Sequence, residues 1–499
     1  MNRDFVILST GRIIQSAIGI VSIRLLTSLL SPAEVGNYYL IFAVIGFCTL
    51  TFISPVGFYI NRKLHGWAEH RVAVSRYKSS HYYLLLVSIV SIVAVYFINK
   101  VFGIGSSIGT LQFSLIIGFF LYLSTCNQAI VPAFNMLGRR LHFVVFMALT
   151  LCLGLVFSIL LVEHVSRTAF CWVLGQVIAL GAIALIAWRY FKKILNENSL
   201  SSESVTGQGT ESLRHIFAFT WPLSLTFFFM WGQNLSYRII VEKTAGLEFL
   251  GMLGVGFGIA AGMAAALESV VQQLYFPLFY GGINTSDPDR RAKAWNSMAK
   301  ATVPLYTAFA VMVSCLSPFL MKLLAGERFH SSFIFLLCGA WVEFFRMTNN
   351  ILSGVAHSEM QTRHLVKAYL AGAVIAATGT VLALKHPGRA TLIPLVLILS
   401  GLSTVLVMYF DMKKLMRLHI FTKELLLSVL LSIPFLSAIF FYSHKNDLYV
   451  SSGLVFVFGT YFLFSQYKLN EEIVSGRKKK TAHVEMTTKS SVPQSQDIV

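Results

Sequence analysis

Polar residues interrupt several long apolar stretches of this sequence, and their types suit the binding of a polar ligand. In the first stretch Arg12 and Gln15 fall on one stripe at helical spacing. In a later stretch Glu343, Arg346 and Asn350 follow one another at i, i+3 and i+7. Guanidinium and amide groups bind anions and hydroxyls, whereas carboxylates bind cations. The predicted substrate-binding residues are Arg12, Gln15, Arg24, Asn127, Gln128, Gln233, Asn234, Arg238, Glu268, Glu343, Arg346, Asn349 and Asn350.

The elements that must position these residues are transmembrane helices. Apolar residues make up 56% of the chain and charged residues only 12%. Apolar runs of about 20 residues, each long enough to cross a bilayer, recur along almost the whole length. The sequence therefore predicts an all-α polytopic membrane protein with about fourteen transmembrane helices. We expect them near residues 5–30, 36–58, 82–102, 112–135, 143–162, 168–190, 216–238, 250–276, 301–324, 332–354, 366–385, 390–410, 424–442 and 448–466.

The net charge of +18 indicates topology rather than nucleic-acid binding. Lys and Arg gather in the loops on one side of the predicted helices, as between Lys413 and Lys423, and are sparse in the opposite loops. Both termini are therefore predicted to be cytoplasmic. The six cysteines lie inside predicted spans without metal-like spacing, so we expect no disulfide, no zinc site and no cofactor.

The charges expected inside the spans are mostly positive. A charge at the centre of a bilayer costs roughly 2.5–3.5 kcal/mol, so these residues should face protein or water. Four of the arginines named above stand against two glutamates, and four minus two leaves a surplus of about two positive charges. Such a surplus favours an anionic substrate over an organic cation.

Structural roles compete with binding at most of these positions. Arginines near helix ends could reach the membrane interface instead. Glu343 and Arg346 could form a purely structural pair, and the amides of the fourth helix could join neighbouring helices. Small residues ahead of Glu268 would permit close helix packing, with Glu268 paired to a neighbouring Arg.

Two sequence echoes suggest that the chain contains a duplicated unit. The segment Arg24–Gly36 returns as Arg238–Gly251, and Cys126–Gln128 returns as Thr348–Asn350, at offsets of roughly 214 and 222 residues. We therefore expect two parallel six-helix lobes around a central cavity. The predicted units are an N-terminal lobe (1–195), a cytoplasmic linker (196–214), a C-terminal lobe (215–415), two additional transmembrane helices (416–467) and a basic cytoplasmic tail (468–499).

The segment Arg24–Tyr38 resembles the first helix-turn-helix of polysaccharide-biosynthesis flippases. These are Wzx-type members of the multidrug/oligosaccharidyl-lipid/polysaccharide (MOP) exporter superfamily. Asn135–Arg140 looks like the family's turn after the fourth helix, and Leu213–Leu223 like its entry into the seventh. Many relatives have Asp-Arg where this chain has Tyr237-Arg238, so the acid is not carried over but the Arg is.

The resemblance implies a transporter, not an enzyme. Its substrate would be an undecaprenyl-pyrophosphate-linked oligosaccharide, moved by alternating access to the outer leaflet of the bacterial cytoplasmic (inner) membrane for O-antigen and lipopolysaccharide synthesis. Cationic residues of the cavity would hold the pyrophosphate. The implied unit is a monomer that contacts membrane lipid and works with a polysaccharide polymerase and a chain-length regulator.

Two other functions compete with this interpretation. A drug/cation antiporter of the same superfamily would differ in the charge of its substrate. A membrane-embedded polysaccharide polymerase or acyltransferase would usually need a sizeable outer loop or clustered His and Asp. The predicted outer loops are short and the histidines scattered, which disfavours the enzyme.

Overall fold

The computed structural model describes residues 3–69, 73–197, 213–283, 285–445 and 447–490, and every regular element within these ranges is a helix. Thirteen helical stretches are long and apolar enough to cross a membrane. The predicted all-α polytopic fold is therefore confirmed. The helices that contribute all or part of their length to these stretches are α1 (Arg3–Leu29), α2 (Pro32–Cys48) with α3 (Ser54–Glu69), α4 (Ala73–Phe102), α5 (Thr110–Met136), α6 (Arg140–His164), α7 (Ala169–Glu197), α10 (Leu247–Ile283), α11 (Pro288–Leu324), α12 (Phe333–Ser358), α13 (Arg363–Leu384), α14 (Arg389–Leu415), α15 (Thr422–Ser432) and α16 (Leu448–Ser490).

The helix predicted over 216–238 is broken into two. The structure has α8 (Leu213–Asn234) and α9 (Ser236–Ala245), which are not among the thirteen apolar stretches. Leu235, between them, leaves the helical conformation with φ −131°. The hydroxyl of Ser236 donates to a carbonyl one turn earlier, so a side chain takes the acceptor that a continuous helix would use.

The second predicted span also departs from regular α geometry. α2 continues into α3 through a five-residue π-helical turn, η1 (Thr49–Ile53). A π turn places more residues in each turn than an α-helix does, and such turns are frequent at functional sites. The hydroxyl oxygen of Thr51 is buried there without a hydrogen-bond partner in the described part of the chain.

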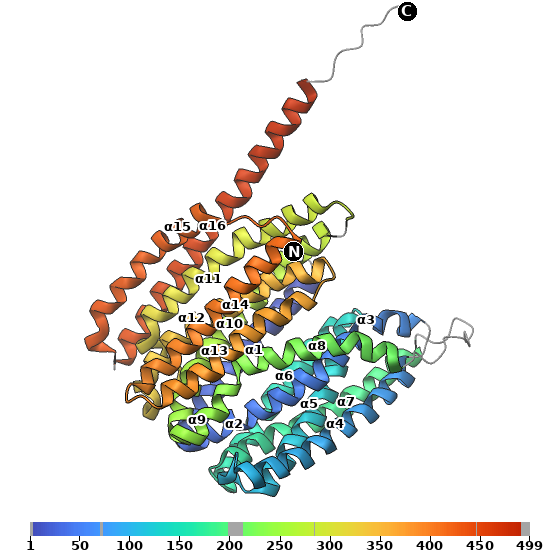
Figure 1. Cartoon of the computed structure of the whole chain (residues 1–499), viewed down its shortest axis with the longest axis vertical. Coiled ribbons are helices and arrows are strands. Elements are labelled where there is room, and N and C mark those ends of the chain that lie inside the picture. The colour runs from blue at the N-terminus through green and yellow to red at the C-terminus, as the bar shows by residue number, and fades with distance from the viewer. Residues whose placement is uncertain (1–2, 70–72, 198–212, 284, 446, 491–499) are drawn as a thin grey trace, which may run out of the picture.

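The last two spans pack as a hairpin against α11. α15 continues as a 3-10 segment, η4 (Ile433–His444), before α16 begins. Tyr442 of η4 donates a 3.1 Å hydrogen bond to the carbonyl of Cys315 on α11. α16 extends far past residue 467, where the sequence predicted only a polar tail, and projects from the bundle (Figure 1). Residues 491–499 of that tail, and 198–212 of the predicted linker, lie outside the described residues.

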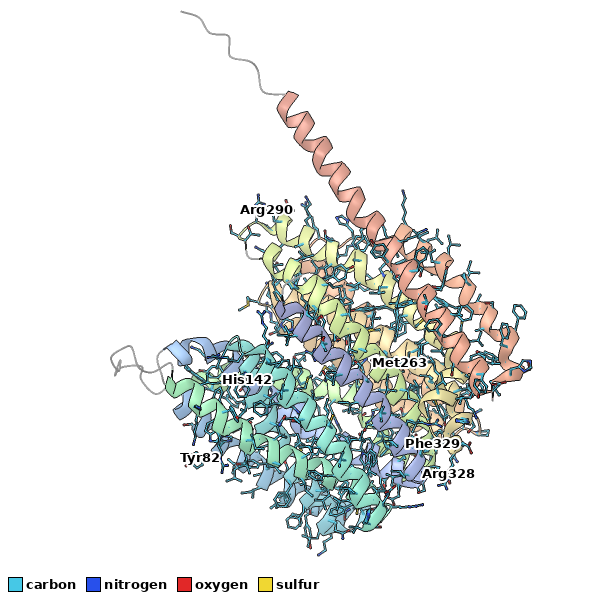
Figure 2. The ribbon with its side chains drawn as sticks, turned by 180° about the vertical axis from the view of Figure 1, so that it is seen from behind. Tyr82, His142, Met263, Arg290, Arg328 and Phe329 are labelled. Atoms are coloured by element: carbon cyan, nitrogen blue, oxygen red, sulfur yellow. The ribbon has the colours of Figure 1, made fainter. Side chains whose placement is uncertain are left out.

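The other helices form two groups with α1 between them (Figure 1). Helices α2 and α4–α7 pack together in the first group, and α10–α14 in the second. α1 lies against α6 of the first group and α10 of the second, and crosses the back of the molecule between them (Figure 2). α8 packs against α13 and also against α3 and η1. Both α1 and α8 therefore connect the two halves.

The two groups touch where α2 and α10 begin, and two glycines make this contact possible. A side-chain carbon at Gly36 would overlap the carbonyl oxygen of Leu247, and one at Gly251 would overlap the carbonyl oxygen of Pro32. Backbone carbonyls cannot rotate away as a flexible side chain can, so only glycine fits at either position. Gly36 and Gly251 are the glycines of the predicted sequence echo. The duplicated segments therefore pack on each other reciprocally.

The most deeply buried span, α11, supports the helix that carries much of the predicted site. Its residues Tyr306, Phe319 and Met321 are fully buried. The indole nitrogen of Trp295 donates a 2.9 Å hydrogen bond to the carbonyl of Ile351 on α12. Close packing of this kind fixes the rotation of α12 and thereby the direction of its polar face.

Candidate functional site

A cavity of about 400 Å³ in the C-terminal half brings together seven of the thirteen predicted site residues. Its walls come from α8, α9, α10, α12, α13 and α14. Aromatic and aliphatic side chains such as Phe257 and Leu397 surround a set of polar groups. The predicted residues that line it are Gln233, Asn234, Arg238, Glu343, Arg346, Asn349 and Asn350.

An ion-pair cluster joins α10 and α12 at the wall of this cavity. The guanidinium of Arg346 reaches Oε2 of Glu343 at 2.5 Å and Oε2 of Glu268 at 2.8 Å. The side-chain nitrogen of Asn350 donates a 2.8 Å hydrogen bond to Oε1 of Glu268. Three of these residues share one face of α12 because they are spaced i, i+3 and i+7. The expected pairing of Glu268 with a neighbouring Arg is confirmed.

Two small residues of α10, Gly254 and Gly258, serve helix packing. Side-chain carbons added at Gly254 or Gly258 would overlap the ring or hydroxyl of Tyr39. Tyr39 belongs to α2, so these glycines create the space for an aromatic residue of the other half. This outcome agrees with the packing interpretation of the small-residue stripe.

Arg238 on α9 is held by aromatic and neutral groups. Its guanidinium lies 5.1 Å from the ring centroid of Tyr39 and 5.8 Å from that of Tyr237. It also donates 3.4 Å hydrogen bonds to the carbonyl of Tyr39 and the hydroxyl of Tyr237. No carboxylate of the described residues pairs with it.

The charges at the cavity balance. Arg238, Arg346 and Glu343 line the cavity, and Glu268, which does not line it, pairs with Arg346; two positive and two negative charges leave a net charge of zero. The predicted surplus of about two positive charges is therefore wrong for this cavity. The other two predicted arginines, Arg12 and Arg24, lie outside the cavity.

Two amide oxygens at the cavity are buried without a partner in the part of the chain that the structure describes. They are Oε1 of Gln233 and Oδ1 of Asn349. A buried acceptor without a donor is costly, so a ligand that supplies hydroxyl or amine donors would be favoured here.

Arg24 has a structural role at the end of α11. Its guanidinium donates to the carbonyl of Lys322 at 3.0 Å and to the carbonyl of Ala325. These carbonyls lie in the last turn of α11 and just after it, where the helix supplies no backbone donor. Nearby, the backbone N–H of Gly326 donates a 2.8 Å hydrogen bond to the hydroxyl of Thr27. Arg24 thus fastens α1 to the α11 terminus, away from the cavity.

The other predicted residues are also spread over α1 and the N-terminal half. Arg12 donates to Gln15 within α1 at 2.9 Å. Asn127 donates to Thr150 at 3.3 Å and thereby joins α5 to α6. Gln128 lines a separate cavity of about 220 Å³ beside the π turn. The structure does not bring these four residues into the cavity of Arg346.

Sequence reasoning missed two tyrosines of the cavity. Tyr369 on α13 and Tyr237 on α9 both line it. A tyrosine within an apolar helix looks the same whether its hydroxyl faces a cavity or a neighbouring helix. No residue spacing would have singled these two out.

No protein-family model matches the chain, and no curated protein matches it by sequence. Solved structures do match it. The lipid II flippase MurJ in an inward closed conformation has a TM-score of 0.64 at 12% identity, covering 94% of this chain and 99% of that one. The inward-facing conformation of a multidrug resistance MATE family transporter of the MOP superfamily has a TM-score of 0.57 at 14% identity, covering 81% and 95%. A MATE in complex with MaL6 has a TM-score of 0.51 at 13% identity, covering 82% and 94%.

The chain has the fold of the MOP superfamily. The superfamily fold expected from the sequence is thereby confirmed, while the Wzx-type assignment stays a prediction. In this MOP fold the cavity of Arg346 belongs to the C-terminal group of helices. Glu268 and Glu343 are buried there, and the Arg346 side chain is 30% exposed.

Proposed function

We propose that this chain is a flippase that moves an undecaprenyl-pyrophosphate-linked oligosaccharide from the cytoplasmic to the outer leaflet by alternating access. The observation that carries the proposal is the extent of the structural match. The lipid II flippase matches 94% of the chain, whereas the MATE transporters named above match 81–82%. More of this chain is thus accounted for by a flippase than by a drug transporter.

The cavity supports a substrate that bears phosphate and sugar. Arg238 has aromatic contacts but no carboxylate partner within the described residues, so its guanidinium can pair with a phosphate oxygen. The unpartnered oxygens of Gln233 and Asn349 can accept hydrogen bonds from sugar hydroxyls. A volume of about 400 Å³ lies within the usual range of small-ligand sites.

The contact of α2 with α10 supports alternating access. In the predicted orientation, with both termini in the cytoplasm, this contact lies toward the outer face. The chain is then closed to the outside in the conformation described, and opening requires the two glycine contacts to separate.

The balanced charge of the cavity favours a second candidate, a drug/cation antiporter. Two buried carboxylates share one guanidinium, so loss of that pairing would expose negative charge to a cation. Such a transporter would exchange an organic cation for protons or Na⁺ through the same cavity.

Reconstitution of the full chain in liposomes separates the two candidates. One assay follows a fluorescent undecaprenyl-pyrophosphate-linked oligosaccharide by its accessibility to an external quencher, and the other follows a cationic dye under an ion gradient. The flippase proposal expects leaflet exchange of the lipid, weakened by Arg238→Gln, without dye flux. Dye flux against ion counterflow, with the lipid remaining in its leaflet, would establish the antiporter instead.

The same proposal includes the cellular setting. The chain would lie in the bacterial inner membrane as a monomeric transporter. It would supply glycan to a polysaccharide polymerase and a chain-length regulator during O-antigen synthesis. Complementation of strains that lack individual glycan flippases, scored by surface polysaccharide, would identify the glycan.

A further inference from the structure

A further, strongly basic cavity lies at the opposite end of the molecule from Arg290 and from the part of α16 that projects from the bundle (Figure 2). It has a volume of about 290 Å³ and is lined by Lys322 of α11, His330 of the 3-10 turn η3 (Glu327–Ser332) and Lys445 of the η4–α16 turn. Figure 2 shows this end at the neighbouring residues Arg328 and Phe329. Three cationic or titratable side chains from three separate segments therefore meet in one small space.

Neither lysine of this cavity pairs with a carboxylate among the described residues. Lys445 lies 5.1 Å from the ring centroid of Phe333, and Arg24 adds a further positive charge at the carbonyl of Lys322. The nearest acid of the η4–α16 turn, Asp447, accepts hydrogen bonds from the first backbone N–H groups of α16. Glu327 of η3 is close enough to act on His330 electrostatically, so Lys322, Lys445 and Arg24 outnumber the nearby carboxylate and the site keeps a net positive charge.

The imidazole of His330 adds an independent sign of a ligand. Its Nε2 is buried and has no hydrogen-bond partner in the part of the chain that the structure describes. Lysines at a membrane interface commonly extend toward water singly, and such residues need no shared cavity. The ring also forms a hydrogen bond with the backbone of Ala325. Nε2 can donate to a phosphate oxygen when it carries a proton, and can accept from the O–H of a protonated phosphate when it does not, so a phosphate would satisfy it in either form beside the two lysines.

We propose that the cavity of Lys322, His330 and Lys445 binds a phosphate group. Two ammonium groups and one imidazole N–H can together donate to the oxygens of a phosphate, and the volume admits a phosphate or diphosphate group but not a glycan. The phosphate can belong to a lipid headgroup or to free inorganic phosphate, because both present the same oxygens. This site is separate from the cavity of Arg346 and does not depend on the proposed transport.

Binding to the purified full chain in a neutral detergent tests the proposal. Inorganic phosphate is titrated by calorimetry, and phosphatidylglycerol is titrated in parallel, with diacylglycerol as a phosphate-free lipid. Lys322→Gln and Lys445→Gln should each weaken phosphate-dependent binding by about tenfold or more, as expected for loss of a charge-assisted hydrogen bond. Arg328→Gln is the matched control, because it removes an exposed positive charge near His330 that does not line the cavity.

Saturable binding of inorganic phosphate that fails in both lysine variants and survives in the control supports a free-anion site. The same dependence for phosphatidylglycerol alone supports a headgroup site. Equal binding in Lys322→Gln, Lys445→Gln and Arg328→Gln, or no saturable binding to either probe, overturns the proposal. If a Gln variant does not elute as a single folded species, His330→Gln and the charge-retaining Lys322→Arg and Lys445→Arg provide the comparison.

Discussion

The amide pairs at matching positions of the two halves have different surroundings. In the N-terminal half, Asn127 donates to the hydroxyl of Thr150 and Gln128 lines a small cavity. In the C-terminal half, Asn350 donates to Glu268, which is also paired with Arg346. The first arrangement joins two helices through neutral groups, whereas the second belongs to a network of charges.

The backbone contact between the halves is, by contrast, nearly symmetric. Gly36 meets Leu247, and Gly251 meets Pro32, at the same step of the sequence echo. The two matching segments therefore share one backbone contact, whereas the buried Glu–Arg cluster of the described residues lies in the C-terminal half. Under the proposed function, the C-terminal half would supply the ligand contacts and the N-terminal half would move against it.

The largest effect that tests this difference is expected for Arg346→Ala. Removing the guanidinium leaves Glu268 and Glu343 buried together without a cation. We expect transport to be abolished and the free energy of unfolding to fall by about 3 kcal/mol, near the low end for a broken buried pair because 30% of the Arg346 side chain is exposed. Flux into liposomes and thermal unfolding in detergent measure the two effects.

Replacing all three charged residues of the ion-pair cluster distinguishes an effect on stability from an effect on transport. The triple variant Glu268→Gln, Glu343→Gln and Arg346→Met carries no buried charge at these positions, so it should unfold close to the wild-type temperature yet fail to transport. Full transport by this variant, or wild-type stability of Arg346→Ala, would remove the contrast between the halves.

The next effect tests the symmetric contact. Gly36→Ala and Gly251→Ala should each lower the free energy of unfolding by about 1–3 kcal/mol, because the new methyl group overlaps a backbone carbonyl. The double variant should lose less than the sum, since either change alone already separates α2 from α10. Gly57→Ala is the matched control, because its added carbon would meet no atom within 4 Å. Additive losses would indicate two independent contacts.

A smaller loss is expected at the end of α11. Arg24→Gln should cost about 1–2 kcal/mol of stability, because two carbonyls at that helix terminus lose their donor. Substrate affinity should stay unchanged, since Arg24 lies away from the cavity. Arg12→Gln serves as the comparison and should cost about 0.5 kcal/mol or less, because it breaks only a contact within one helix. If Arg24→Gln instead lowered the affinity for substrate, Arg24 would have to contribute to the binding site.

The smallest effect is expected for Asn127→Ala. Its hydrogen bond to Thr150 joins two membrane helices, and such bonds contribute about 0.6 kcal/mol on average. Transport should continue at close to the wild-type rate, whereas Asn350→Ala should slow it by loosening Glu268. Comparing initial rates of the two variants measures the contrast directly; equal impairment would mean that both halves contact substrate.

Much of the fold follows from residue patterns. Apolar runs of membrane length predicted nearly all of the spans, and helical spacing placed Glu343, Arg346 and Asn350 on one face. The echo of Gly36 in Gly251 indicated related segments, although the sequence did not show that they touch. The spans and the shared face of α12 depend on the spacing of residues close together in the sequence, which can be read directly from it.

What the sequence did not reveal depends on partners distant along the chain. Arg24 binds backbone carbonyls at Lys322 and Ala325, and backbone groups have no sequence signature. The break at Leu235 carries no proline or glycine of its own. The net charge of the cavity depends on which charged side chains lie together in the fold. A count of charges along the sequence does not give that.

The reciprocal glycine contact joins the halves near the end at which α2 and α10 begin. Under the proposed alternating access, each half would rotate about this contact as about a hinge. α10, which carries Gly251, has 37 residues and is about 55 Å long, and tilting it by about 10° about this end would displace the other by roughly 10 Å. A small rotation at two glycines would therefore suffice to admit a large headgroup at the far side of the bilayer.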